Sequence, residues 1–386
     1  MAGYFQKTTT AGNGVPRMKY SADYPSLQDA MNDLQEGDTM VINADYTLTS
    51  TVECTQRNIL ILGKGTTIKP STNGSPSPLL RLKNTTSIPT LTNVSINGIR
   101  FRNADGVSDG SGTGVALEIL DNYPTVSSGF VWHIKIHDVD AANFAKAILL
   151  ENTFDIVVDN CHLSGNQIGL RCETTATAKT TGQIKVFGGF LNGNQYHISL
   201  DGATGTSLDH IELFGVSMGH QRTGAAGDSI GLFLGKDTGG VFVFGSHIED
   251  VATGIYLSAN AFVAVISVFG SKFIDIINTG VATIDGSGIG SINLVGNSFA
   301  PKSGSSAVFY KAPTVNDGVL IGGNLRSSND TRPAIGYLEH SPTSGKSVYR
   351  VPTYSDSTRP SASTVPAGSI IRNSTSNKLN ISDGSN

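Results

Sequence analysis

Charge is scarce in this chain, and neither sign of charge gathers in one place. Only 15% of its 386 residues are charged, and the formal net charge at pH 7 is -4. Because there is no basic stripe, we expect no nucleic-acid partner. No apolar run reaches the roughly 18 residues that a membrane-spanning helix needs, so we expect no membrane insertion. The start, Met1 to Lys7, lacks the apolar core of a signal peptide, so classical secretion is not expected either.

Motifs for metals, phosphates and nucleophiles are equally sparse. Cys54, Cys161 and Cys172 are odd in number and lack the spacing of metal ligands, so we interpret them as small buried residues. The loop serines have no His/Asp partner at a recognisable spacing, and the glycine-rich loops follow no phosphate-binding order. The sequence therefore predicts no cofactor and no metal.

What the sequence does contain is a five-residue window that recurs along most of its length. The window reads apolar, variable, apolar, variable, then Gly or another turn residue. From Asn160 onward, the last residue of the window falls at positions 160, 188, 215, 245, 270, 296 and 323. A strand of period two, closed by a turn and repeated at a near-constant step, predicts a β-solenoid. The spacing between successive positions in this series suits a solenoid with three short strands per turn. The copies, clearest first, are Ile184–Gly188, Ile211–Gly215, Val241–Gly245, Ile266–Gly270, Ile292–Gly296, Ile59–Gly63, Val94–Gly98, Ile134–Asp138, Ile156–Asn160 and Val319–Gly323.

One short helix is expected before the strands. Apolar residues from Leu27 to Leu34 fall at i, i+3, i+4 and i+7, and Ser26 with Asp29 forms a variant of the capping box. An open first turn would leave strand edges and core in water, so we interpret this helix as the cap of the solenoid.

The entry into the strands resembles a known superfamily. Tyr24 to Asp29, then Gly37-Asp38-Thr39, then Tyr46 to Thr49 before a Gly-ended apolar strand resemble the entry of pectate-lyase-like right-handed parallel β-helices. That superfamily includes polysaccharide lyases and hydrolases and the tailspikes of bacteriophages. The resemblance covers residues 22–325 in pattern. It implies an all-β fold, a right-handed parallel β-helix of about ten rungs.

The last part of the chain changes character. Residues 341–368 are linker-like, and Gly368–Arg372 and Lys378–Ser382 flank a turn, which predicts a hairpin. The placement of Pro, Gly and Ser in this region resembles that of a short β module found near the C-termini of phage tail fibres and tailspikes. We therefore expect an N-terminal arm (1–22), a β-helix (23–340) and a linker with a C-terminal hairpin module (341–386).

This resemblance implies a phage tail receptor-binding protein. Such a protein is assembled in the host cytoplasm as part of the virion tail, and it recognises a polysaccharide on the host cell surface, with or without cleaving it. The resemblance also implies a homotrimer that attaches to the virion tail or an adaptor protein through the N-terminal arm. Two alternatives stay open, a free polysaccharide hydrolase or lyase and a structural spacer. Loops at 71–78, 105–114 and 219–228, expected on one face, argue against a spacer.

Three acidic residues are predicted to line up on the outside of the solenoid. Inward apolar pairs such as Ile148/Leu150 set the register of a second strand in each turn, and Glu151, Glu173 and Asp201 each follow such a pair directly. Adjacent turns are about 4.8 Å apart. Like charges at this spacing raise at least one pKa, and a protonated carboxyl group beside an ionised one is the usual pair for cleaving a glycosidic bond.

Glu151, Glu173 and Asp201 are therefore candidate catalytic residues, and hydrolysis is favoured because no Asp cluster of the calcium-dependent lyase kind is present. Arg171, on the same face, is a candidate substrate-binding residue that can orient a carboxylate or bind an acidic sugar. The alternative is that these carboxylates are solvated turn positions or bind a cation.

A second polar group surrounds Val131–Asp138. Alternation puts Trp132, Ile134 and Ile136 on one side of this strand and the two histidines on the other. The step to the next turn places His133 opposite Asp155 and His137 opposite Asp159. His–Asp pairs perform acid–base work near neutral pH, so these four are candidate substrate-binding residues; the alternative is simple cross-strand charge pairing.

A column of phenylalanines lies beside the turn residue of each window. Its members are Phe187, Phe214, Phe244 and Phe269. Strict alternation places them outside, whereas a break in alternation at the corner would let them fill the core. Core, subunit interface and sugar-stacking surface therefore all remain open.

Overall fold

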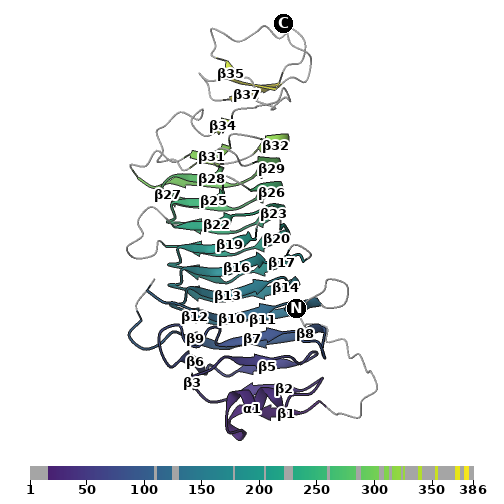
Figure 1. The fold of residues 1–386 in the computed structure, drawn as a ribbon. Helices are drawn as coiled ribbons and strands as arrows, with labels where there is room; N and C mark the ends of the chain where they lie inside the picture. The colour runs from purple at the N-terminus through teal and green to yellow at the C-terminus, as the bar shows by residue number, and fades with distance from the viewer. Residues whose placement is uncertain are drawn as a thin grey trace.

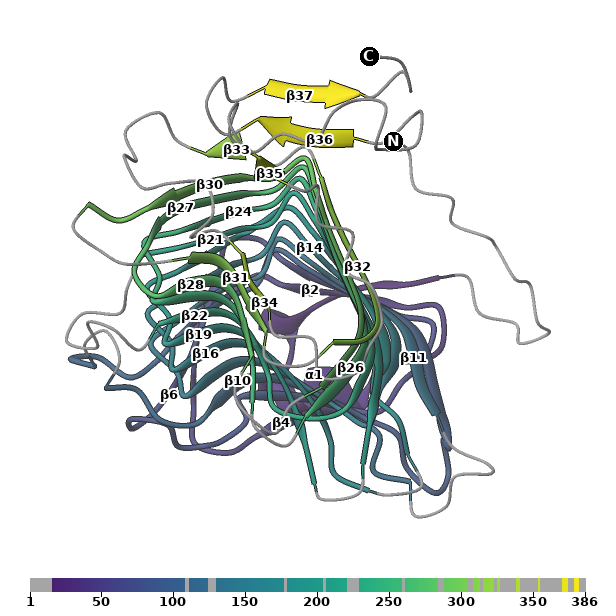
Figure 2. The ribbon, with the colours of Figure 1, turned by 90° about the horizontal axis from the view of Figure 1, so that it is seen from above.

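Three parallel β-sheets run along the length of the molecule (Figure 1). The structure is a computed structural model. It describes residues 16–303 apart from 108–110, 124–129, 177–178, 204–205, 221–228, 259–260 and 284–287, together with the later strands given below. Each turn of the chain contributes one strand to each sheet. Seen from above, the chain winds counterclockwise as it rises toward the viewer (Figure 2). The fold is therefore a right-handed parallel β-helix, as the sequence predicts.

We name the sheets A, B and C in the order in which the chain meets them. Sheet A consists of β1 (Met18–Tyr20), β2 (Thr39–Ile42), β5 (Leu60–Gly63), β8 (Thr90–Asn97), β11 (Phe130–His137), β14 (Phe154–Asp159), β17 (Gly182–Phe187), β20 (Leu208–Phe214), β23 (Thr238–Phe244), β26 (Phe262–Phe269), β29 (Gly288–Val295) and β32 (Val315–Gly322). Sheet B consists of β3 (Tyr46–Leu48), β6 (Thr67–Pro70), β9 (Arg100–Arg102), β12 (Asp140–Ala142), β15 (His162–Ser164), β18 (Phe190–Asn192), β21 (Ser217–Gly219), β24 (His247–Glu249), β27 (Lys272–Ile276), β30 (Ser298–Pro301) and β33 (Leu325–Arg326). Sheet C consists of β4 (Val52–Cys54), β7 (Leu80–Lys83), β10 (Val115–Leu120), β13 (Lys146–Glu151), β16 (Ile168–Thr174), β19 (Tyr196–Gly202), β22 (Ile230–Leu234), β25 (Thr253–Leu257), β28 (Thr279–Thr283), β31 (Val308–Ala312) and β34 (Leu338–His340).

The strand registers of sheet A confirm the recurring window. Ile156 pairs with Ile184, and Ile184 pairs with Ile211. The same position continues in register through the later turns as far as Val319. In the windows from Ile59 to Gly296, the two apolar positions are buried in one continuous core. Sheets B and C have 11 described strands each, slightly more than the ten or so turns that the pattern indicates.

The window ends in Gly, Asn or Asp because the chain turns sharply between sheets A and B. In most turns this last residue has a positive φ, including Gly98, Asp138, Asn160, Gly188, Gly215, Gly245, Gly270 and Gly296. Glycine adopts this left-handed conformation freely, and Asn and Asp tolerate it better than other residues do. The corner therefore explains the composition of the repeat.

The predicted helix covers the first turn of the solenoid. It is α1 (Leu27–Asn32), and the side chain of Ser26 accepts a hydrogen bond from the Asp29 N–H. Its apolar face belongs to the same core as the strands. The Gln28 side chain accepts a hydrogen bond from the Glu53 N–H at 2.7 Å and donates one to the Glu53 carbonyl at 2.9 Å, so it satisfies the open edge of β4. The cap thus closes both the core and a strand edge.

The described end of the N-terminal arm belongs to the solenoid. β1 pairs in parallel with β2, and a short 3-10 helix, η1 (Ser21–Asp23), follows it. Lys19 of β1 is buried and pairs with Asp33 at 2.6 Å and Asp38 at 3.2 Å. β1 is therefore the first strand of sheet A, and the arm before residue 16 lies outside the described residues.

The C-terminal hairpin is present. β36 (Ile370–Asn373) and β37 (Lys378–Ile381) pair antiparallel, as predicted, and β35 (Thr353–Tyr354) adds a parallel strand beside β36.

The three cysteines are free and buried, which confirms their interpretation as core residues. Burial raises the pKa of the Cys54 thiol to about 11 and that of Cys161 to about 12.

The loops that the sequence places on one face share the corner between sheets B and C. They connect β6 to β7, β9 to β10 and β21 to β22. The first two touch, since the Thr113 N–H donates to the Asn73 side chain at 3.1 Å and the Gly74 N–H donates to the Asn103 side chain at 3.0 Å. Residues 108–110 and 221–228 of these loops lie outside the described residues.

Candidate functional site

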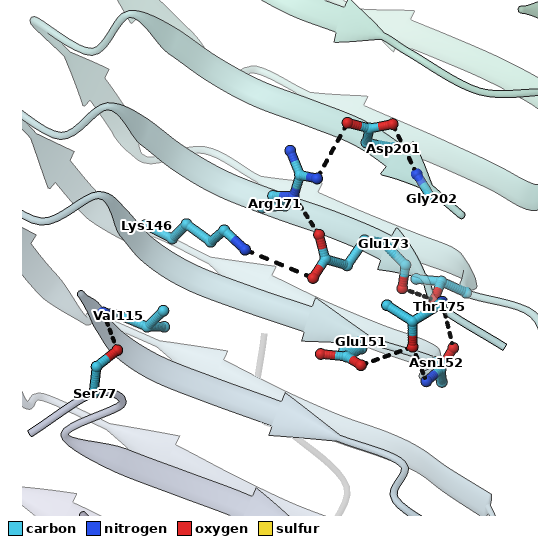
Figure 3. A network of polar contacts seen from close by, with 11 residues as sticks. Ser77, Val115, Lys146, Glu151, Asn152, Arg171, Glu173, Thr175, Asp201 and Gly202 are labelled. Atoms are coloured by element: carbon cyan, nitrogen blue, oxygen red, sulfur yellow. Dashed lines mark hydrogen bonds and ion pairs between the residues drawn. The ribbon is translucent and has the colours of Figure 1, made fainter. Parts of the chain in front are cut away.

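Sheet C places three acidic side chains of successive turns in register. Glu151 of β13 pairs with Glu173 of β16, which pairs with Asp201 of β19 (Figure 3). This confirms the predicted register, and we call these three residues the acidic ladder. Because neighbouring strands are about 4.8 Å apart, Glu151 and Asp201 are separated by about 9.6 Å along the solenoid.

Two cations neutralise the middle of the acidic ladder. Arg171 bonds through Nε to Glu173 and through Nη2 to Asp201 Oδ2 at 3.1 Å (Figure 3). Lys146 Nζ lies 3.6 Å from Glu173 Oε1. Glu173 is only 9% exposed, so its charge is balanced by neighbours rather than by water. Arg171 therefore orients two carboxylates at once, one of the two roles expected for it.

Glu151 and Asp201 differ in their surroundings. Glu151 accepts a hydrogen bond from Thr175 Oγ1 at 2.7 Å, and the structure shows no cation within ion-pair distance of it among the described residues. Burial raises the pKa of Glu151, the Thr175 hydrogen bond opposes this, and the nearby Glu173 adds to it. Asp201 instead accepts hydrogen bonds from Arg171 and from the Gly202 N–H at 2.8 Å. One end of the ladder is thus suited to hold a proton, whereas the carboxylate at the other end is held by an arginine and a backbone N–H.

An aromatic strip continues the ladder toward the C-terminus, and the sequence reasoning missed it. Tyr196 and Phe233 have ring centroids 5.2 Å apart, and Phe233 stacks on Tyr256 at 5.8 Å with an interplanar angle of 13°. We call these three residues the aromatic strip. Phe233 and Tyr256 occupy the same outward position as Arg171 in later turns. The three residues share no motif, but Phe233 and Tyr256 each lie between two inward apolar residues, so the register that aligns the ladder also aligns these two rings.

The strip and the ladder touch at Gly235. A Cβ added to Gly235 would lie 2.7 Å from the Phe233 ring and 3.0 Å from Asp201 Oδ1. Glycine at this position therefore lets the ring approach the carboxylate. Ser199 occupies the outward position between Arg171 and Phe233, yet it is only 1% exposed, so flat side chains cover this part of sheet C.

The His–Asp pairs form as predicted, but on sheet A. His133 Nε2 lies 2.7 Å from Asp155 Oδ2, and His137 Nδ1 lies 3.0 Å from Asp159 Oδ2. His137 also contacts Asp138 at 2.9 Å. These pairs belong to β11 and β14, whereas the acidic ladder belongs to sheet C. The structure therefore separates the predicted site residues into two groups on different sheets.

The prediction that Trp132 lies on the same side of its strand as Ile134 and Ile136 is wrong. Trp132 is 39% exposed, while Val131 and Ile134 on either side are buried. The cause is His133, which has a φ of 53° and adds a residue to the strand without continuing its alternation. Trp132 and His133 consequently both lie on the outer surface.

The phenylalanine column lies outside the core. Phe187, Phe214, Phe244 and Phe269 stack with centroids 4.9, 5.1 and 5.5 Å apart and interplanar angles of 9–10°. Phe187 is 37% exposed, and none of the four belongs to the buried core. The core interpretation is therefore wrong, and the interface and sugar-stacking interpretations remain.

A second charged cluster lies lower on sheet C. Glu53 pairs with Arg81 at 3.2 Å and with Lys83 at 2.8 Å, and Arg81 also bonds to Glu118. Ion pairs are thus a general feature of this surface.

Within the described part of the chain, no group of three or more His, Cys, Asp or Glu is arranged to hold a metal ion. No helix there is long and apolar enough to cross a membrane.

Comparison with known proteins yields no match to a family model and none to a curated protein. Among solved structures, the chain is similar to ORF18 of Geobacillus virus E2, with a TM-score of 0.49 and 14% identity. That match covers 80% of this chain and 60% of the viral one, so the chain spans less than two thirds of that protein. It is also similar to the A-module of mannuronan C-5 epimerase AlgE6 of Azotobacter vinelandii (TM-score 0.37, 15% identity, 81% of this chain and 100% of that one).

A third similar structure is tailspike protein 3 of bacteriophage CBA120, with a TM-score of 0.26 and 12% identity over 94% of this chain and 67% of that one. At these sequence identities, the roles and substrates of the three proteins are not transferred to this chain. The architecture of this chain is defined by the strand registers of its own three sheets.

Proposed function

We propose that this chain is a phage tail receptor-binding protein that holds a host surface polysaccharide on the outer face of sheet C and hydrolyses it there. The observation that carries the glycan-processing part is the alignment of Glu151, Glu173 and Asp201 in consecutive turns, beside the aromatic strip. The phage-tail part rests on the sequence resemblance of the solenoid entry and of the C-terminal module.

The two ends of the acidic ladder divide the chemistry between them. Glu151 donates a proton to the oxygen of the leaving sugar, because its pKa is raised by burial. Asp201 acts as the base that activates water, held by Arg171. Their spacing of about 9.6 Å lies close to the upper end of the range for inverting hydrolases, so the product anomer is inverted.

The aromatic strip supplies binding beside the cleavage point. Aromatic faces stack against the apolar faces of sugar rings, and tyrosine adds a hydroxyl for hydrogen bonding. Because the strip follows the ladder along the solenoid, the glycan lies parallel to the long axis of the molecule. Arg171 and Lys146 both contact the middle acid, Glu173, and these cations can also meet an acidic sugar.

The test is incubation of the full chain with purified host capsule and O-antigen polysaccharides, following product size and reducing ends. We expect cleavage that falls at least 100-fold in Glu151→Gln and in Asp201→Asn. Glu53→Gln, in the separate ion-pair cluster of the same sheet, is the matched control and should retain activity. Equal activity in all three variants would remove the ladder from the mechanism.

A spacer without ligand is the second candidate, and the Glu53–Arg81–Glu118 cluster favours it. That cluster shows that sheet C uses ion pairs between turns where no chemistry is proposed. If the ladder is only such a cluster, the chain neither binds nor cleaves any host polysaccharide. Binding without cleavage would instead retain the receptor-binding role and reduce the ladder to surface charge.

A further inference from the structure

Two aromatic–polar pairs lie side by side on the outer surface of sheet A, away from the acidic ladder. In β11 the pair is Trp132 and His133, and in β14 it is Phe154 and Asp155. Trp132 is the single tryptophan of the chain, and it is in register with Phe154 of the next turn. Phe130, which is 50% exposed, lies two residues before Trp132 and hence on the same face of β11.

The backbone turns both members of each pair outward. His133 and Asp155 have φ values of 53° and 54°, a left-handed conformation that is uncommon for residues other than glycine. In β11 this conformation places two outward residues between the buried Val131 and Ile134. Bulges of this kind redirect side chains and are enriched next to functional sites. Regular alternation would instead turn one of Trp132 and His133 into the core.

The polar members of the pairs are held at the edge of the aromatic surface. The rings of Trp132 and His133 lie 4.1 Å apart with an interplanar angle of 22°, and His133 Nε2 lies 2.7 Å from Asp155 Oδ2. The imidazole is thus fixed between the indole and the carboxylate. One turn below, Asn93 shares the left-handed conformation and donates a hydrogen bond to Asn58 Oδ1 at 2.8 Å. An ordered polar edge therefore borders exposed aromatic faces.

We propose that Phe130, Trp132 and Phe154, together with His133 and Asp155, form a second carbohydrate-binding site. Sugar rings combine apolar faces, which stack on aromatic rings, with hydroxyl groups at their edges. Exposed aromatic side chains bordered by a few fixed polar groups match both features. The ligand class rests on the proposed function, whereas the site belongs to sheet A and is separate from the acidic ladder. It holds the polysaccharide without touching the bond that is cleaved.

The single tryptophan makes this site directly observable. Titration of the full chain with purified capsular and O-antigen polysaccharides should change Trp132 emission in a saturable way with at least one of them. Affinity electrophoresis in the same polysaccharide measures retention independently. We expect Trp132→Ala to weaken retention at least tenfold. His133→Asn should weaken it too, and it folds because Asn tolerates the left-handed conformation. Circular dichroism verifies folding of both variants.

The matched control is Phe262→Ala, which removes an exposed aromatic side chain from the start of β26 in the same sheet. Retention should not change in this variant. Retention of the native chain with unchanged Trp132 emission and full affinity in Trp132→Ala overturns this second site and leaves the proposed function standing. No retention in any host polysaccharide overturns both.

Discussion

Two glutamates on the outer face of sheet C show how surroundings decide what a carboxyl group does. Burial raises the pKa of Glu151, and the neighbouring Glu173 adds to this effect against the hydrogen bond from Thr175. Burial acts in the same direction on Glu53, but Lys83 and Arg81 outweigh it and hold the pKa of Glu53 below its usual value. The first is therefore suited to donate a proton, and the second to remain an ion-pair partner.

These opposite shifts predict opposite effects of two matched substitutions on stability. Because the folded-state pKa of Glu151 is raised, its ionisation costs stability above the ordinary glutamate pKa, so Glu151→Gln should raise the unfolding midpoint at pH 7. Glu53 has a lowered folded-state pKa and contributes stability above the ordinary pKa, so Glu53→Gln should lower the midpoint at pH 7. Both differences should shrink toward pH 3, where the carboxyl groups become protonated. Thermal unfolding followed by circular dichroism from pH 3 to 8 measures them, and shifts of equal sign at pH 7 would contradict the argument.

At the scale of the strand and the turn, the sequence predicts what depends on a strict period. Inward apolar positions determine the register, so the alignment of Glu151, Glu173 and Asp201 follows from the pattern alone. An argument from strict alternation does not detect a bulge. It therefore puts Trp132 on the wrong side of the strand, because the bulge at His133 interrupts the alternation. The same register aligns Phe233 with Tyr256, whereas the contact of Phe233 with Tyr196, which occupies a different position of the turn, is evident only in the structure.

The corner between sheets A and B predicts a simple test of backbone conformation. Gly215 has a φ of +62°, and a Cβ added there meets no atom within 4 Å, so only the backbone resists a substitution. Gly215→Val should destabilise the fold by about 1–2 kcal/mol, the usual cost of a side chain in this conformation. Gly215→Asn is the control and should cost less, since Asn160 occupies the same corner position two windows earlier in the series. Denaturant unfolding measures both, and equal costs would refute the conformational explanation.

At the scale of the whole molecule, the phenylalanine column is an apolar stripe along four consecutive turns. Phe187 through Phe269 stack nearly parallel on the outer surface beside the corner between sheets A and B. Phe190, 36% exposed, lies just past this corner in sheet B. An extended apolar stripe favours burial against another surface. A second and third copy of the chain, as the sequence resemblance implies, would cover it.

The trimer expected from the resemblance can therefore be tested at the stripe itself. If copies of the chain meet there, the native protein sediments at three times the monomer mass. Replacing Phe214 and Phe244 by Glu places two charges in the contact, which should dissociate the assembly to monomers without unfolding the solenoid, because neither ring belongs to the core. Phe262→Glu, at an exposed site of sheet A outside the stripe, should leave the mass unchanged. Analytical ultracentrifugation measures all three proteins. A monomeric native chain would exclude the trimer, and a trimer that survives both glutamates would place its interface elsewhere, leaving the stacked rings available to sugars.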